Sequence, residues 1–163
     1  MSKAFLSMLF AASLISSAAR AEEEAGLTLP LAMTAMNEAF RACSAFKVAV
    51  TIVDPDGVIK LQARGDGSPI HSQRFSFRKA YTVVSMGPMM GVESSGEVTK
   101  FLNSVNPNGT AAVGAGSSDL LFLPGAVLLK AGGRTIGAIG VSGAPLSADD
   151  QACAVSAAAK IKD

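Results

Sequence analysis

The chain contains no tryptophan, one histidine and two cysteines among its 163 residues. A single histidine excludes any metal site or proton relay that is built from two imidazoles. The sequence also lacks the Gly-x-Ser-x-Gly, Walker A, Cys-x-x-Cys and His-Glu-x-x-His motifs. The usual sequence signatures of serine hydrolases, P-loop NTPases, dithiol oxidoreductases and zinc proteases are therefore missing.

Strong charge of either sign is also missing. Only 17% of the residues are charged, and 14 basic residues nearly balance 13 acidic ones. Such a chain has no field that would attract nucleic acid or an anionic membrane surface. After the N-terminal segment there is no uninterrupted apolar run of about 18 residues, so the sequence predicts no membrane span.

The N-terminus has the pattern of a secretory signal peptide. Lys3 precedes an apolar run over residues 4–15, and the small residues Ala19-Arg20-Ala21 follow. We expect cleavage after residue 21 and a periplasmic or secreted mature protein. Residues 22–26 form a short acidic leader that we expect to be disordered, and residues 27–163 are long enough for one domain.

The two cysteines, Cys43 and Cys153, are expected to form a disulfide. Export to an oxidising compartment favours pairing, and each cysteine lies on the apolar face of its own predicted helix. Two buried free thiols are the alternative.

Hydrophobic periodicity and turn signals predict an α+β domain, with a central antiparallel sheet of about five strands and helices packed on it. Met33, Met36 and Phe40 repeat at helical spacing in the first helix, and Ile70, Phe77, Tyr81 and Val84 do so in the second. The second helix is expected to stop at Gly87-Pro88. The expected helices cover 28–46, 69–86, 95–105 and a segment from 147, and the expected strands cover 48–53, 58–64, 120–123 and both arms of a hairpin within 125–145.

The second arm of that last hairpin has glycines at 137, 140 and 143. Glycine in a strand marks a place where another backbone or surface comes close. We interpret this spacing, together with the low charge, as a surface suited to close packing, and we expect the mature chain to be at least a dimer.

One face of the helix predicted over 69–86 carries His71, Arg74, Phe75 and Arg78. An imidazole in the first turn of a helix meets the positive end of the helix dipole, which favours its neutral, metal-ligating form. Guanidinium groups bind carboxylates, and a phenyl ring can lie against a flat macrocycle. The alternative is an exposed histidine surrounded by solvated arginines.

Three segments together resemble the GlcG/HbpS-like family: Val48–Asp54 with Gly57, Asp66–Ser72 followed by Arg78-Lys79-Ala80-Tyr81-Thr82, and the hairpin of residues 125–145. The resemblance extends over residues 27–163. It implies a compact α+β domain that forms dimers or larger assemblies. Some members bind haem and are linked to its degradation or to redox sensing, and others are associated with small acids.

The leading hypothesis is therefore an exported haem-binding protein in which His71 is an axial ligand of the iron, Arg74 and Arg78 contact the propionates and Phe75 covers the ring. Storage, sensing and breakdown of haem all remain open, and no catalytic residue is assigned. One alternative is an enzyme or binding protein for a small carboxylate. Another is a non-catalytic module that assembles with itself or with a sensor protein.

Overall fold

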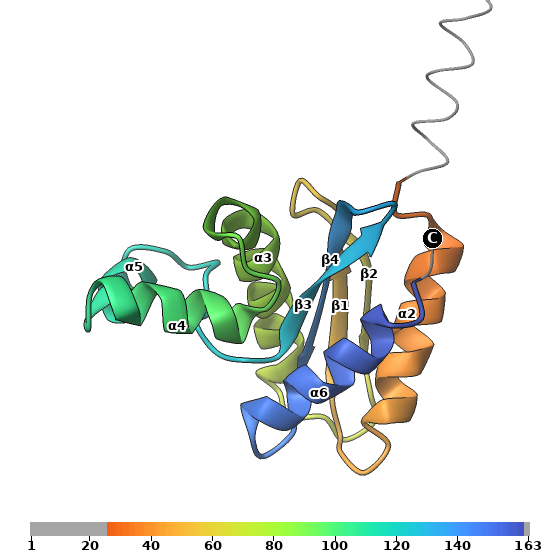
Figure 1. The fold of residues 1–163 in the computed structure, drawn as a ribbon. Helices are drawn as coiled ribbons and strands as arrows, with labels where there is room; N and C mark the ends of the chain where they lie inside the picture. Colours follow the sequence, from red (N-terminus) through yellow and green to blue (C-terminus); the bar gives the residue numbers. More distant parts are fainter. Residues whose placement is uncertain (1–25, 162–163) are drawn as a thin grey trace, which may run out of the picture.

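The structure is a computed structural model, and it describes residues 26–161. The predicted signal peptide and nearly all of the acidic leader lie outside the described residues. Within them, the chain folds into a four-stranded antiparallel sheet with helices on both faces (Figure 1). None of the helices in this part of the chain is long and apolar enough to cross a membrane.

The strands run in the order β2-β1-β4-β3. Two hairpins build the sheet, and β1 pairs with β4 to join them. The bounds are β1 Ala49–Val53, β2 Ile59–Arg64, β3 Ala126–Ala131 and β4 Arg134–Ser142. The α+β prediction is confirmed, but the strand predicted over 120–123 is wrong, because that segment has no strand partner and lies against helix α3 through Leu121, whose amide donates to Thr82 Oγ1.

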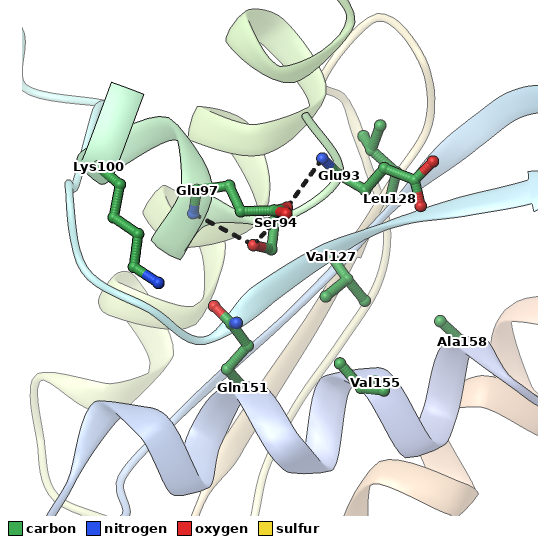
Figure 2. Close-up of a pocket in the computed structure, with 9 residues that line it drawn as sticks. All are labelled: Glu93, Ser94, Glu97, Lys100, Val127, Leu128, Gln151, Val155 and Ala158. Carbon is green, nitrogen blue, oxygen red and sulfur yellow. Dashed lines mark hydrogen bonds between the residues drawn. The ribbon is translucent and has the colours of Figure 1, made fainter. Parts of the chain in front are cut away.

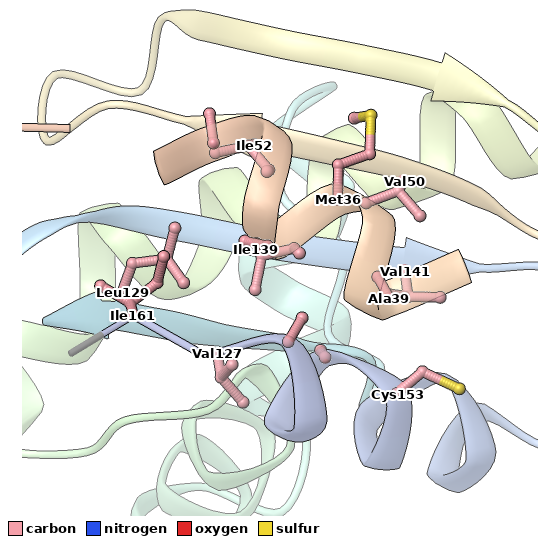
Figure 3. Close-up of a cluster of buried hydrophobic side chains, with 14 of the residues drawn as sticks. Met36, Ala39, Val50, Ile52, Val127, Leu129, Ile139, Val141, Cys153 and Ile161 are labelled. Carbon is pink, nitrogen blue, oxygen red and sulfur yellow. The ribbon is translucent and has the colours of Figure 1, made fainter. Parts of the chain in front are cut away.

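Helices α2 (Leu29–Ala42) and α6 (Ser147–Ala158) cover one face of the sheet. Their small residues let them approach the sheet closely, and Figure 3 shows Met36 beside Val50 of β1 and Ala39 beside Val141 of β4, in one buried cluster that also includes Cys153. Met33 was expected in this core, but its side chain is exposed, because it lies on the outer side of α2. The predicted disulfide is present: Cys43 and Cys153 are joined with an S–S distance of 2.04 Å.

Helix α3 (Ser72–Met90) covers the opposite face. It begins three residues later than predicted and continues through Pro88, which was expected to end it. Proline in the last turn removes only one backbone donor, and the helix ends where Gly91 adopts a left-handed φ of 66°. Ile70 was placed on the apolar stripe of this helix, but it lies before the helix and is 89% exposed.

Gly140 explains how closely α3 lies on the sheet. A Cβ at this position would be 2.1 Å from the carbonyl oxygen of Ser76 and 2.9 Å from the amide nitrogen of Ala80. The close approach that the glycine spacing predicts is therefore confirmed. It is internal, however: β4 is a central strand, so these glycines do not offer a surface for dimerisation.

Helices α4 (Ser95–Val105) and α5 (Gly109–Ala115) follow α3 and extend to one side of the sheet (Figure 1). Helix α4 has the bounds that the sequence predicts and begins at Ser94, whose hydroxyl accepts from the amide of Glu97 at 3.2 Å. Helix α5 was not predicted.

Candidate functional site

His71 is the residue immediately before α3, rather than a member of its first turn as predicted. Its imidazole is exposed and makes no hydrogen bond to any residue that the structure describes. The ring lies 4.8 Å from the ring of Phe75, one turn further along the helix. Both nitrogens of His71 are thus available to an external ligand.

Arg78 continues this row on the other side of Phe75. Its guanidinium carbon is 6.0 Å from the centre of the Phe75 ring, and its Nη2 donates to the carbonyl of Leu120 at 2.5 Å. The Nε of Arg78 is buried without a hydrogen-bond partner in the described part of the chain. Arg78 therefore holds the segment after α5 against α3 through Leu120, while its buried Nε has no partner in that part of the chain.

Arg74 points to a neighbouring hollow of about 330 Å³ beside β2, which it lines together with Ile59, Ile70 and Phe77. The structure therefore brings His71, Phe75 and Arg78 into one row and places Arg74 next to that row. The hollow adds an apolar surface with one cationic side chain at its edge. No group of three or more potential metal-ligating side chains occurs within residues 26–161.

Sequence reasoning missed a buried ion pair behind the site. Lys79 and Asp150 are 1% and 2% exposed, and Lys79 Nζ lies 2.8 Å from Asp150 Oδ2. The lysine also donates to the carbonyl of Val141, and Asp150 accepts from the amide of Ala144. Burial lowers the pKa of Lys79, and the charge of Asp150 opposes that effect.

The sequence carries only part of the signal for this pair. Lys79 lies at helical spacing from Ser72, Ser76 and Val83, but it is the structure that shows these three residues to be buried. A lysine on the buried face of a helix requires an anionic partner, because an unpaired charge in the interior is costly. The sequence could indicate the need for that partner, but only the fold shows that Asp150 supplies it.

A further hollow lies between α4 and α6 and above β3 (Figure 2). It has a volume of about 490 Å³ and adjoins a second hollow of about 490 Å³ with which it shares five residues. We call the two together the α4–α6 groove. Its shared residues are Ser94, Glu97, Lys100, Gln151 and Val155.

Comparison with known proteins agrees with the fold. A family model described as "Haem degrading protein HbpS-like" matches residues 27–159. The chain belongs to the HbpS-like family. No match was found among curated protein sequences.

Solved structures of HbpS-like proteins support this assignment. A double mutant of HbpS from Streptomyces reticuli is 32% identical, with a TM-score of 0.70 over 82% of this chain and 86% of that one. A further structure of HbpS is 31% identical, with a TM-score of 0.70 over 82% of this chain and 89% of that one. PduOC in complex with haem is 22% identical, with a TM-score of 0.68 over 82% of this chain and 94% of that one, so it supports the fold.

Proposed function

We propose that this HbpS-like protein is an exported haem-binding protein in which His71 is an axial ligand of the iron. The observation that supports this proposal most directly is the exposed imidazole of His71, which has no hydrogen-bond partner among residues 26–161 and lies against Phe75. Family membership adds the kind of ligand, because the matching family is described as haem-degrading.

The side chains around His71 fit haem in their chemistry. A neutral imidazole ligates iron, an aromatic ring covers a porphyrin face, and guanidinium groups bind propionates. In this proposal Arg74 binds a propionate from its place in the neighbouring hollow. Arg78 donates one hydrogen bond to the carbonyl of Leu120, keeps Phe75 near the macrocycle and directs the remaining nitrogens of its guanidinium there. Bound haem would supply an iron centre that the residues themselves do not provide.

Export is part of the same proposal. The signal-peptide pattern of residues 1–21 supports it, and the disulfide between Cys43 and Cys153 is a bond that persists in oxidising compartments. N-terminal sequencing of protein recovered outside the cytoplasm should begin at Glu22. An intact N-terminus on the recovered protein would contradict export by signal cleavage.

A haem titration of the mature protein tests the ligand assignment. We expect a Soret band whose position shifts in His71→Ala and returns when free imidazole is added, because imidazole can occupy the vacated ligand position. Arg74→Ala should weaken haem binding about fivefold, by ~1 kcal/mol, without moving the band, since a propionate contact does not touch the iron. Arg134→Ala is the matched control, since Arg134 is exposed in the distant β3–β4 hairpin.

An unchanged spectrum and affinity in His71→Ala would overturn the ligand assignment and make Met86, Met89 and Tyr81 the next candidates. Absence of haem binding by the unmodified protein would overturn the function itself. Loss of the Soret band with reductant and oxygen present would then indicate that the protein degrades haem, and a stable band would exclude degradation under those conditions.

A further inference from the structure

The α4–α6 groove lies apart from the row formed by His71, Phe75 and Arg78, and the proposed haem site does not use it. Val127 and Leu128 of β3 both line the groove, and the side chain of Val127 forms its floor on the α6 face of the sheet. Its α6 wall includes Val155 and Ala158 (Figure 2). Val155 is 52% exposed although it is aliphatic and faces Val127 across the groove. An apolar group placed between the two valines would remove that surface from water.

Some charged side chains at the groove are paired within the described residues, and others are not. Glu93 forms a salt bridge with Lys130, so these two neutralise each other at one rim. The ammonium group of Lys100 makes no hydrogen bond or salt bridge to any residue within 26–161. Figure 2 shows its ammonium directed toward the side-chain amide of Gln151. Gln151 uses its Oε1 to accept from the amide of Gly96 at 3.3 Å, which leaves its NH₂ group as a donor.

Glu97 contributes the opposite charge on the same wall, one helical turn before Lys100. Its Oε2 accepts from the Ser94 hydroxyl at 2.8 Å and from the Glu93 amide at 3.1 Å. The hydrogen bond from Ser94 lowers the pKa of the Glu97 carboxyl, so the group is ionised at neutral pH. Both hydrogen bonds end on Oε2, so Oε1 of Glu97 can accept a hydrogen bond from a ligand.

The groove thus combines an anionic acceptor, a cationic donor, an amide donor and an apolar floor. Glu93, Glu97 and Lys100 line the groove, and Lys130 pairs with Glu93 from outside its lining. The charges of these four side chains sum to zero, which disfavours a ligand with net charge of either sign. A molecule that carries both an ammonium and a carboxylate next to a short aliphatic group would satisfy all of these features.

We infer that the α4–α6 groove binds a free aliphatic α-amino acid, with its carboxylate on Lys100 and Gln151, its ammonium on Glu97 and its side chain between Val127 and Val155. In a pocket of this kind, a few polar groups fix the orientation of the ligand, and apolar contacts supply most of its affinity. The site is separate from the proposed haem site, so either can fail without the other.

Isothermal titration of the disulfide-bonded mature protein with L-leucine tests this inference. 4-Methylpentanoate lacks the ammonium of leucine, and 3-methylbutylamine lacks its carboxylate. Each should bind at least about tenfold more weakly than leucine, because one charged group of the groove loses its partner. Glycine, which lacks the aliphatic group, should also bind more weakly.

Three variants assign the contacts. Lys100→Met should remove the preference for leucine over 3-methylbutylamine. Glu97→Gln should remove the preference for leucine over 4-methylpentanoate, and it should keep the hydrogen bonds that Ser94 and Glu93 donate to this side chain. Val155→Asn should weaken the binding of leucine more than the binding of glycine. Lys60→Met is the matched control, because Lys60 lies on β2 at the far edge of the sheet.

The inference is overturned if leucine gives no binding heat at millimolar concentration. It is also overturned if 4-methylpentanoate binds as tightly as leucine, which would indicate a simple carboxylate site, or if Lys60→Met weakens leucine as much as Lys100→Met does. Circular dichroism of every variant shows that a loss of binding is not a loss of fold.

Discussion

At the residue scale, Lys79 and Asp150 form an ion pair in the interior. Lys79 comes from α3 and Asp150 from α6, so the pair joins helices that cover opposite faces of the sheet. Gly125 makes room for it, since a Cβ there would be 2.7 Å from Lys79 Nζ. Buried ion pairs of this kind are costly to break, because removing one partner leaves an isolated charge in the interior.

We expect Asp150→Asn to lower the free energy of unfolding by about 3–5 kcal/mol, because Lys79 would keep its charge without a counterion. The double variant Lys79→Met/Asp150→Asn should lose much less than the sum of the two single variants, and the carboxamide introduced by Asp150→Asn could still accept from the amide of Ala144. Urea unfolding of the four proteins measures the coupling. Additive losses would contradict the pairing.

How far the sequence predicts individual residues depends on whether their role is local. The start of α2 was predicted correctly because Thr28 caps it, and capping depends on neighbours along the chain. The row of His71, Phe75 and Arg78 also follows from helical spacing. Arg74 shares that spacing but lines a hollow made with β2, so its neighbours depend on strand placement that spacing cannot show.

At the element scale, α2 and α6 are held together more firmly than any other pair of helices. The disulfide links them, and Glu38 of α2 accepts hydrogen bonds from Arg41 and from Ser156 of α6. The hydrogen bonds from Arg41, then Ser156, lower the pKa of Glu38 to about 2. Export, the even number of cysteines and the helical phase sufficed to predict this link.

We expect the double variant Cys43→Ala/Cys153→Ala to unfold at lower urea concentration, with a loss of up to ~4.7 kcal/mol in the chain-entropy description. The reason is that the bond closes a loop of 110 residues in the unfolded chain. Equal stability of the oxidised protein and the double variant would contradict this expectation.

The ends of elements were harder to predict than their existence. Helix α3 starts only at Ser72 and continues through Pro88 until Gly91, whose left-handed φ of 66° ends it. Helix α5 has no charged residue and little apolar periodicity in its sequence, GTAAVGA, so no local signal identifies it.

At the scale of the whole molecule, the sheet has four strands where about five were expected, since the chain between α5 and β3 lies over α3 instead of joining an edge. This segment belongs to a weakly charged region: residues 101–129 contain a single charged side chain, Asp119. Phe101, Val105 and Val113 are exposed there. An exposed apolar surface without charge is typical of a contact with another protein chain.

We expect the mature protein to be at least a dimer by light scattering at micromolar concentration, with the α4–α5 region in the contact. Val105→Glu should shift the population to monomer, because a charge would be buried in the interface. Val58→Glu is the control at an exposed valine in the β1–β2 turn. A monomeric unmodified protein would contradict the expectation.

The bond between Cys43 and Cys153 also makes most of the domain a covalent ring. Every element from β1 to β4, together with α3, α4 and α5, lies between the two joined cysteines. One cut by a protease anywhere in that stretch would open the ring without releasing a fragment, so a damaged molecule in an environment rich in proteases would keep both pieces until the bond was reduced.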